Sequence, residues 1–571
     1  MKKYLCLAVF LSLWALPAAA LPDNDSNNTL TYDGQTVAGL EPIVAGHGQQ
    51  NADGNTVTVS NSTIQDNNSP LHNAQVVGGW AVSGTANQNR VDITDSTVNR
   101  NIVGGQSAFG TQANGNIINI TQSKVNEGAA LQDMTTLSSY QAEHRYDDQG
   151  NGIYVLSSMV SDSVKTAGNI APESSLYTTH GGIVANGEAS GNQISVSGNG
   201  SVIGNNLMGA YSPYLEETHL HDNSVTVTNA QVTGLITGAG SLGANWNTTI
   251  QDPLTVNNNT ITVTSSQIND AIGAYGGLAT NGNRITLVGS SADNLYGVSF
   301  GQDIFYSGAQ PDTIENTANN NSVLLYNNSS ATGNIYGAQS HSVQAYGNQV
   351  VLARGSSAQG SIYGAHISNA RVQTSDTTVD WNTVQTAAEN NTLSLSGSTA
   401  GNASAHLAAA KNFSGWANNN TVDITDSTVT AAILAGGWAE HERQTLTGAV
   451  YGGLVSTKDD INPDGVTDDT LSSASSNLVH LDTSTLTGNV YGGAAQGDDT
   501  SANQNRVWLT DTQVTGSVYG ALAEGTHSSA AQNEVILQNS TVTGDVYAAS
   551  AAQGGSNTVT LSGQSRVDGT V

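Results

Sequence analysis

A short acidic segment in the second half of the chain has the residue spacing of a calcium-binding loop. Oxygen-bearing side chains occupy alternate positions, and Gly465 allows the turn that lets them converge on one ion. Leu471 stands where an EF-hand places its bidentate glutamate, which excludes an EF-hand. Two interpretations remain: a looser calcium site that stabilises the loop, or an ordinary acidic turn. The candidate ligands are Asp460, Asn462, Asp464 and Asp468.

A pair of histidines is the second candidate for metal chemistry. His219 and His221 would lie on one face of a strand, with Glu216, Glu217 and Asp222 nearby. Imidazole and carboxylate groups in such a cluster can ligate a transition metal. The alternative is a solvated insertion loop, for which this polar composition is equally typical.

Other enzyme motifs are incomplete. His441–Glu442 begins a zinc-protease motif, but Thr445 stands where the second histidine must be. Residues 238–243 match the glycine spacing of a dinucleotide-binding loop, yet no helical pattern follows them. Paired acids at Asp147–Asp148 and Asp498–Asp499 leave a glycan-cleaving enzyme open, since such an enzyme needs carboxylates in one groove.

The overall composition narrows the class of protein. The chain carries 15 Lys and Arg against 45 Asp and Glu, a formal charge of −30, so a phosphate backbone would be repelled and nucleic-acid binding is excluded. Hydrophobic residues make up 37%, which is low for an ordinary enzyme core of this length. Charged residues are only 11%, too few for a typical charged disordered chain. The composition predicts an extended, glycine-rich architecture with a thin core.

Residues 1–20 have the pattern of a secretory signal peptide. Met1–Lys3 is positively charged, Tyr4–Leu16 is apolar, and Ala18–Ala20 supplies a small-residue cleavage site. Cleavage would remove Cys6, the only cysteine, so the mature chain would have no disulfide. We expect export through the inner membrane, and no later segment approaches the roughly 18 apolar residues of a membrane span.

One repeat accounts for nearly all of residues 51–571, whereas residues 21–50 are predicted to be an N-terminal lead-in or cap. The consensus is N-x-V-x-I-T-x-S-x-V-x-G-x-V-Y-G-G, with clear copies at Asn89–Val98, Asn420–Val429 and Asn505–Val514. The mean spacing is about 33 residues, which is typical of solenoids. The predicted repeat starts are Asn55, Asn89, Asn116, Asn151, Asn192, Asn223, Asn259, Asn283, Asn321, Asn348, Asn391, Asn420, Asn477, Asn505, Asn533 and Asn557.

The local pattern indicates strands that stack between repeats. In residues 55–60 the side chains alternate with period two, and β-branched residues occupy both faces. A single repeat buries too little apolar surface to fold alone, so each strand must pair with its equivalent in the next repeat. We predict an all-β, right-handed parallel β-solenoid of about sixteen irregular rungs, with the hand taken from the rule for parallel crossovers. An antiparallel sandwich array is the alternative.

Stacking would place identical residues in ladders along the solenoid. The recurrent asparagines, represented by Asn89, Asn420 and Asn505, would join their amides from rung to rung. The recurrent tyrosines would stack their rings, and the glycine pair beside them would let the chain bend. The predicted ring ladder comprises Tyr275, Tyr296, Tyr336, Tyr363, Tyr451, Tyr491, Tyr519 and Tyr547.

Insertions of variable length interrupt the repeat. They follow its glycine-bearing half, so we expect them to emerge on one flank of the solenoid, where they would either form a binding face or reflect neutral length drift. The long insertions are Asn126–Gly150, Lys165–Gly191, Asn205–Asp222, Ser299–Asn320, Ser368–Asn390 and Ala439–Ser476.

A signal peptide followed by Asn-, Ser-, Thr- and Gly-rich repeats ending in V-Y-G-G resembles the passenger of a bacterial autotransporter (type V secretion). The resemblance covers residues from about 50 to 571 and implies an adhesin or aggregation factor exported through a C-terminal outer-membrane β-barrel. This chain departs from that pattern: its last phenylalanine is Phe413, and Arg566–Val571 stops within a repeat. We therefore expect the barrel on a missing C-terminal part, and a periplasmic location if no barrel is supplied.

The expected function is non-catalytic. A rigid solenoid would present polar loops and strand faces to surface glycans, to host or bacterial surface proteins or to copies of itself, and repetition would convert weak contacts into avidity. One alternative is a polysaccharide lyase or hydrolase on the same fold. Another is a truncated autotransporter remnant without a present role.

Overall fold

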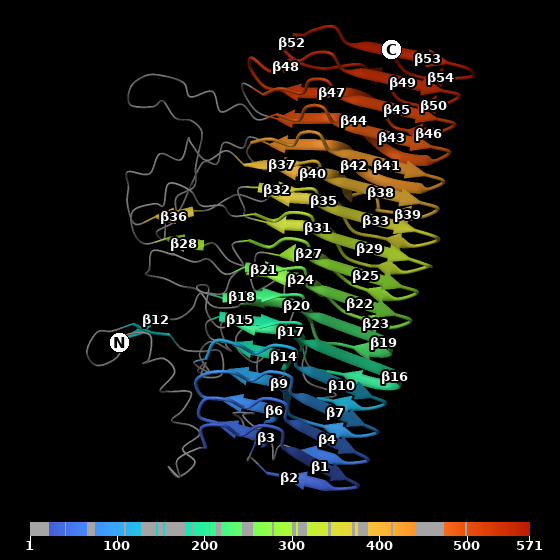
Figure 1. Cartoon of the computed structure of the whole chain (residues 1–571). Coiled ribbons are helices and arrows are strands. Elements are labelled where there is room, and N and C mark those ends of the chain that lie inside the picture. Colours follow the sequence, from blue (N-terminus) through green and yellow to red (C-terminus); the bar gives the residue numbers. More distant parts are fainter. Residues whose placement is uncertain are drawn as a thin grey trace. The chain divides into compact units, whose positions relative to one another are not determined.

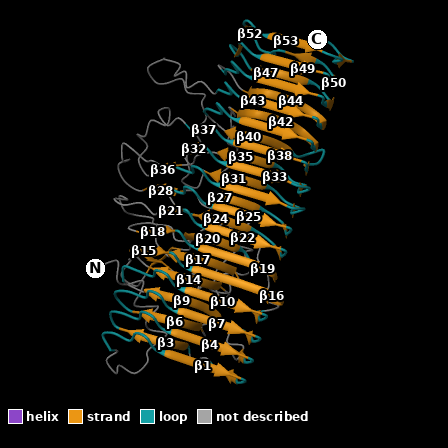
Figure 2. Ribbon diagram, turned by 45° about the vertical axis from the view of Figure 1, so that its right-hand side comes forward, coloured by secondary structure: helices purple, strands orange, loops and turns teal. Residues whose placement is uncertain are grey.

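The structure is a computed structural model in which every described element is a β-strand. Figure 2 shows strands and loops but no helix in the part of the chain that is described. The described residues are 22–39, 42–65, 75–107, 110–126, 144–146, 152–154, 178–184, 187–204, 206–212, 218–241, 255–276, 279–299, 304–306, 317–340, 344–367, 372–374, 386–412, 415–440, 473–496 and 500–571.

A typical rung of the fold consists of three strands that pair in parallel with the same three strands of the next rung, and the C-terminal rung contains only the first two. The first strand, β4 (Thr56–Ser60), pairs with β7 (Arg90–Thr94) without a register shift. The shorter second strands pair in the same way, and so do the third strands, which carry the glycine pair (Figure 1). The predicted parallel β-solenoid is confirmed, and its right-handed sense stays a prediction.

The chain forms two compact units, and the first comprises Met1–Asn245, Ile250–Asp270 and Tyr275–Gly277. Its first strands are β1 (Thr29–Asp33), β4, β7, β10 (Ile117–Thr121), β16 (Gln193–Ile203), β19 (Ser224–Val232) and β22 (Thr260–Thr264), of which β16 and β19 continue into the second strand. The separate second strands are β2 (Thr36–Ala38), β5 (Thr63–Gln65), β8 (Thr97–Val98), β11 (Lys124–Val125) and β23 (Gln267–Ile268). The third strands are β3 (Ile43–Gly48), β6 (Gln75–Ala81), β9 (Asn101–Ser107), β14 (Thr178–Val184), β17 (Asn206–Ser212) and β20 (Ile236–Ser241). Smaller sheets contain β15 (Gly187–Ser190), β18 (Thr218–His221) and β21 (Thr255–Asn257), and the antiparallel pair β12 (His144–Tyr146) and β13 (Gly152–Tyr154).

The second unit comprises Trp246–Thr249, Ala271–Ala274 and Leu278–Val571, and β24 (Ala271–Tyr275) contributes residues to both units. Its first strands are β25 (Arg284–Val288), β29 (Ser322–Tyr326), β33 (Gln349–Ala353), β38 (Thr392–Ser396), β41 (Thr421–Thr425), β43 (Leu478–Asp482), β45 (Arg506–Thr510), β49 (Glu534–Gln538) and β53 (Thr558–Ser562). The separate second strands are β26 (Ser291–Ala292), β30 (Ser330–Ala331), β34 (Ser357–Ala358), β39 (Thr399–Ala400), β46 (Gln513–Thr515), β50 (Thr541–Val542) and β54 (Arg566–Val567). The third strands are β27 (Leu295–Ser299), β31 (Ile335–Ser340), β35 (Ile362–Ile367), β40 (His406–Asn412), β42 (Thr428–Glu440), β44 (Thr485–Gln496), β47 (Val518–Glu524) and β51 (Val546–Tyr547), of which β42 and β44 also contain the second strand of their rung. The smaller pairs are β28 (Ile304–Tyr306) with β36 (Val372–Thr374), β32 (Gln344–Tyr346) with β37 (Ala387–Glu389), and β48 (Ser529–Ala530) with β52 (Gln553–Gly554).

The interior of each unit is filled by columns of aliphatic side chains from alternate strand positions. In the first unit Val57 pairs with Val91, Val91 with Ile118, and Ile118 with Ile194. All four are fully or almost fully buried. Burying such a side chain contributes about 1.5–3 kcal/mol, and the column repeats this gain at every rung. The outward neighbours on the same strands are Thr, Ser, Asn, Asp, Gln or Arg, with Ile117 as the one apolar residue, and they remain in contact with water.

A buried asparagine ladder runs along one corner of each unit. The backbone N–H of Asn89 donates to Oδ1 of Asn116 at 2.9 Å, and Nδ2 of Asn89 donates to the same oxygen at 3.1 Å. The second Nδ2 hydrogen can reach a carbonyl on a neighbouring rung, as in the 3.0 Å bond from Asn223 to Ala189. Every polar group of such an amide is therefore satisfied without water.

Each unit contains a continuous run of the ladder. In the first unit it connects Asn28, Asn55, Asn89, Asn116, Asn192, Asn223 and Asn259. In the second unit it connects Asn283, Asn321, Asn348, Asn391, Asn420, Asn477, Asn505, Asn533 and Asn557. Asn89, Asn420 and Asn505, which were named as examples of the predicted ladder, all belong to the observed ladder.

Two positions of the ladder differ from the repeat starts inferred from sequence. Asn28 donates its backbone N–H to Asn55 at 2.9 Å, and β1 to β3 pair in parallel with β4 to β6, so the segment 21–50 contains a rung. Asn116 bonds directly to Asn192, so the expectation that Asn151 starts an intervening rung is wrong. The physical reason is that the rung of Asn116 is completed by β14, which follows a long insertion and pairs with β9.

The insertions leave the rungs at two kinds of junction. Most, including residues 300–316, 368–385 and 441–472, join a third strand to the corner before the next ladder asparagine. Residues 66–74 and 127–177 instead join a second strand to a third strand. Neither junction interrupts the ladder, which explains how the repeat tolerates insertions of such different length.

Two further features of the corners support the ladder. The residue before every ladder asparagine except Asn557 adopts a positive φ angle, for example 56° at Gln88 and 63° at Gly115, which turns the chain into the first strand. A second ladder of hydroxyls follows the first strand: the N–H of Ser62 donates to Oγ of Ser96 at 3.0 Å, and Oγ of Ser96 donates to the carbonyl of Thr94. The repeat consensus contains the serine that corresponds to Ser62 and Ser96, but a hydroxyl ladder was not predicted from it.

The first glycine of the pair lies where the asparagine ladder packs directly against the third strand, which leaves no room for a Cβ atom. A Cβ atom added at Gly492 would lie against the carbonyl oxygen of Gly520 and 3.1 Å from Cβ of Asn505. Neither neighbour can move away, because one is strand backbone and the other is held in the ladder. Glycine is thus required by close packing at this position, since its φ is not in the left-handed region.

We predict that Asn116→Ala destabilises the fold by about 2–5 kcal/mol, because it removes the acceptor of two buried donors on Asn89. The matched control is Asn119→Ala, since Asn119 lies on the outward face of the same rung and donates to Asp92 at 2.8 Å. We expect the control to change stability by less than about 1 kcal/mol. Urea unfolding followed by circular dichroism measures both variants, and equal destabilisation would contradict the central role of the ladder.

We predict that Gly492→Ala lowers the free energy of unfolding by about 1–3 kcal/mol through overpacking against Asn505 and Gly520. Gly554→Ala is the control, because a Cβ atom there meets nothing within 4 Å. A thermal or urea unfolding curve in which both alanines behave alike would refute the packing explanation.

Candidate functional site

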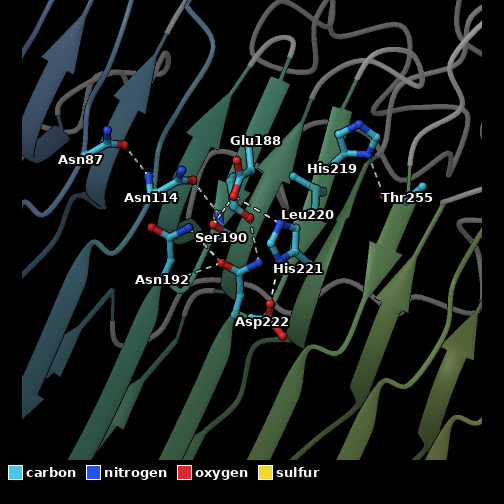
Figure 3. Close-up of polar contacts among 12 residues, drawn as sticks. Asn87, Asn114, Glu188, Ser190, Asn192, His219, Leu220, His221, Asp222 and Thr255 are labelled. Atoms are coloured by element: carbon cyan, nitrogen blue, oxygen red, sulfur yellow. Dashed lines mark hydrogen bonds and ion pairs between the residues drawn. The ribbon is translucent and has the colours of Figure 1, made fainter.

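A polar cluster lies on the outer face of the short sheet formed by β15, β18 and β21. Glu188 on β15 stands opposite His219 on β18, and Ser190 stands opposite His221. The side chains at these positions are half-buried, while Leu220 between the histidines points into the core. The corners that precede Asn192 and Asn223 thus carry outward polar groups, Glu188 and Ser190 on the first and His219 and His221 on the second (Figure 3).

His221 lies between two carboxylates. Its Nε2 is 3.2 Å from Oε1 of Glu188, and its Nδ1 is 2.7 Å from Oδ2 of Asp222. Ser190 Oγ donates to the same Glu188 oxygen at 2.6 Å. Figure 3 shows the chain of contacts from Ser190 through Glu188 and His221 to Asp222. The arrangement orients an imidazole between acceptors at the surface, and it joins neighbouring rungs by polar contacts.

His219 and His221, which the sequence suggested as ligands of one metal ion, contact different partners in the structure. His219 Nδ1 lies 2.9 Å from Oγ1 of Thr255, away from the partners of His221. Glu216 and Glu217 lie outside the described residues. Among the residues that are described, no group of three or more His, Cys, Asp or Glu side chains converges as a metal site requires. Glu188, which does contact His221, was missed because it lies a full rung earlier in the sequence.

Several other sequence candidates lie outside the described residues. They are the calcium-loop positions Asp460, Asn462, Asp464 and Asp468, the acid pairs Asp147–Asp148 and Asp498–Asp499, the pair His441–Glu442, and Tyr451 of the ring ladder.

Six tyrosines on the third strands of the second unit form two stacks of three rings. Tyr336 lies between Tyr296 and Tyr363, with ring centroids 5.2 and 5.3 Å away. Tyr519 lies between Tyr491 and Tyr547 at 5.0 and 5.3 Å. The spacing is close to the separation of paired strands, so the rings stack because the strands do.

Alanines replace the ring between the two stacks. By register, Tyr363 pairs with Ala408, Ala408 with Ala435, and Ala435 with Tyr491. Trp438 lies near these alanines, and the Lys411 ammonium sits 4.0 Å from a ring centroid of Trp438. A tryptophan and its cation partner therefore fill the space beside the missing tyrosines.

Burial changes the acid–base behaviour of the tyrosine stacks. Tyr336 is 8% exposed, and burial raises the pKa of its hydroxyl to about 12. The pKa of Tyr491 is also raised, first by burial and then by the neighbouring Tyr519. The phenol groups of Tyr336 and Tyr491 are therefore neutral at ordinary pH, and their rings contribute to the stability of the fold by packing.

A second outward cluster lies on the first strands of the second unit, and we call it the Trp508 patch. It comprises Asp423 on β41, His480 on β43, Arg506 and Trp508 on β45, and Glu534 on β49. Asp423, His480 and Trp508 follow one another by register, as do Arg506 and Glu534. The alternation of strand side chains directs all five residues outward.

The polar groups of the Trp508 patch are held in place by one another. His480 Nδ1 lies 2.9 Å from Oδ1 of Asp423, and Arg506 Nε lies 2.9 Å from Oε2 of Glu534. The rings of His480 and Trp508 have centroids 5.0 Å apart, and the Arg506 guanidinium lies 5.8 Å from the Trp508 ring. Trp508 and Asp423 belong to different repeats, and no local sequence pattern signals that they meet.

Comparison with protein-family models, curated proteins and solved structures finds no match for this chain. In the part of the chain that the structure describes, no helix has the length and apolar character needed to cross a bilayer.

We predict that stability falls at alkaline pH partly through Tyr336. Its pKa is about 12 in the folded state and about 10 when unfolded, so the folded state holds the proton more tightly. The resulting stabilisation is complete below about pH 10 and is lost as the pH rises towards 12. Urea unfolding from about pH 9 to 11.5 should therefore show a smaller alkaline loss for Tyr336→Phe than for the wild type, and identical pH profiles would contradict this assignment.

Proposed function

We propose that this chain is a non-catalytic, exported adhesive β-solenoid that binds surface glycans or proteins, or associates with its own copies. The observation that carries the proposal is the organisation of its outward faces. Buried amides and hydroxyls are bonded within the ladders, so the interior holds the backbone rigidly and the outward positions are free to vary.

The outward columns supply many equivalent contact points. On the first strands of the first unit one column runs Thr58, Asp92, Asn119, Ser195 and Thr226 by register. Adjacent members are separated by about 4.8 Å, the spacing of paired strands. Repetition of weak hydrogen-bonding groups on a rigid support raises overall affinity through avidity without any single strong site.

The resemblance to autotransporter passengers adds the proposed location. The signal-peptide pattern of residues 1–20 supports export through the inner membrane, followed by a periplasmic or cell-surface position. Calcium binding by the loop at residues 460–468 belongs to the same proposal, since it would stiffen an inserted loop for contact with a partner.

The proposal is tested by coupling the purified mature chain to beads. We expect these beads to aggregate or to bind a panel of glycan- and protein-coated surfaces, whereas beads carrying a compact protein of similar net charge should do neither. Aggregation that depends on the chain supports adhesion. The absence of binding and aggregation on every surface would favour a remnant without a present role.

The same preparation separates adhesion from catalysis. Neutral and acidic polysaccharides are incubated with the chain, and released reducing ends and unsaturated products are measured. We expect none. Reproducible cleavage that is lost when a single Asp or Glu is replaced would favour the glycan-cleaving enzyme instead.

A further inference from the structure

We propose that the Trp508 patch is a binding site for a neutral oligosaccharide, with one sugar ring stacked on the Trp508 indole. The proposal deepens the adhesive function above and rests on it. It names the ligand class and a site for one of the partners proposed there.

The exposure of Trp508 is unusual for this surface. Its relative exposure is 37%, and the other exposed large hydrophobic residues among those described are Tyr346, Leu561 and Val571. Equivalent outward positions in other rungs carry either small polar residues, such as Ser394 and Thr560, or aliphatic residues, such as Val351 and Ile536, so the fold does not need an aromatic residue here. A large rigid ring at such a position is the side chain best suited to stack against the apolar face of a sugar.

Polar groups that suit hydroxyls lie on the β43 side of the ring and beside it on β45, whereas its neighbour on β49 is Ile536. Asp423 is 50% exposed although it contacts His480, and Arg506 is 49% exposed although it contacts Glu534. Carboxylate oxygens accept hydrogen bonds from sugar hydroxyls, and guanidinium N–H groups donate to them. Because both pairs are already oriented by their mutual contacts, little side-chain entropy remains to be lost when a ligand binds.

The charge of the patch favours a neutral sugar over an acidic one. Both basic side chains of the patch, His480 and Arg506, already contact a carboxylate. Asp482 and Gln538 lie on the flanking positions of β43 and β49 and add no positive charge. With a formal chain charge of −30, a carboxylated or sulfated polysaccharide would be repelled rather than attracted.

The dimensions of the patch suit a short chain of sugars. The column from Asp423 through His480 and Trp508 to Ile536 crosses three strand spacings, or about 14 Å. A protein partner is less well matched, because a stable protein interface buries about 800 Å² per side around an apolar centre. Here the apolar part is limited to one aromatic ring and the adjacent Ile536, and the remaining groups of the patch are polar.

The test uses the full mature chain and hexasaccharides of glucose, mannose and N-acetylglucosamine, with oligogalacturonate as the acidic comparison. Binding is measured by isothermal titration calorimetry and by quenching of tryptophan fluorescence. We expect at least one neutral hexasaccharide to bind, with affinity that changes little between low and high salt. Trp508→Ala should weaken binding about tenfold or more, as expected for a central aromatic contact.

Two controls keep the result specific. Tyr346→Ala removes another exposed aromatic residue outside the patch and should leave binding unchanged. Trp508→Phe keeps a smaller ring and should retain part of the affinity, and a urea unfolding curve for each variant checks that the fold is intact.

Three outcomes would overturn the proposal: equal binding by the wild type and Trp508→Ala, binding of oligogalacturonate alone with strong salt dependence, or no binding of any saccharide. The bead assay distinguishes these failures from failure of the adhesive function. Beads that still aggregate, or still bind protein-coated surfaces, would reject the oligosaccharide site while leaving adhesion standing.

Discussion

The fold depends on the buried asparagine ladder. Within the ladder an asparagine typically uses its backbone N–H and its side-chain amide to reach the next rung, as Asn420 does towards Asn477 and Asn477 does towards Asn505. An amide left unbonded in this interior would be costly, so a rung shifted by one residue would lose the ladder together with its hydrophobic column. The ladder therefore specifies the register of strand pairing more strictly than the aliphatic side chains would by themselves.

Other features of the repeat follow from that constraint. The ladder packs so closely against the third strand that glycine is needed there, as at Gly492 beside Asn505. The chain must also turn sharply into the first strand, and a positive φ stands immediately before every ladder asparagine except Asn557, as at Gln504 before Asn505. Insertions enter at junctions away from these positions, so their length can vary without disturbing the pairing of the rungs.

The rigid interior leaves the outer faces available for recognition. Glu188 and His221 meet across neighbouring rungs of the first unit, whereas Asp423, His480 and Trp508 meet in the second. In both clusters the partners come from different repeats and are aligned by strand register. A solenoid can therefore acquire a binding patch through single substitutions in successive repeats, while the ladder and the core remain unchanged.

The sequence by itself determined the strand repeat, the parallel stacking and the asparagine ladder, because period-two alternation and a recurrent residue are local signals. It also indicated the tyrosine stacks, whose rings follow their strands. Only the tertiary structure decided that β14 completes the rung of Asn116, that a rung precedes Asn55, and that Ala408 and Ala435 separate the two ring stacks. It likewise brought His480 to Asp423 across 57 residues. These contacts depend on which strands become neighbours after insertions of unequal length, and that choice is made by pairing and packing of the whole unit rather than by any short segment.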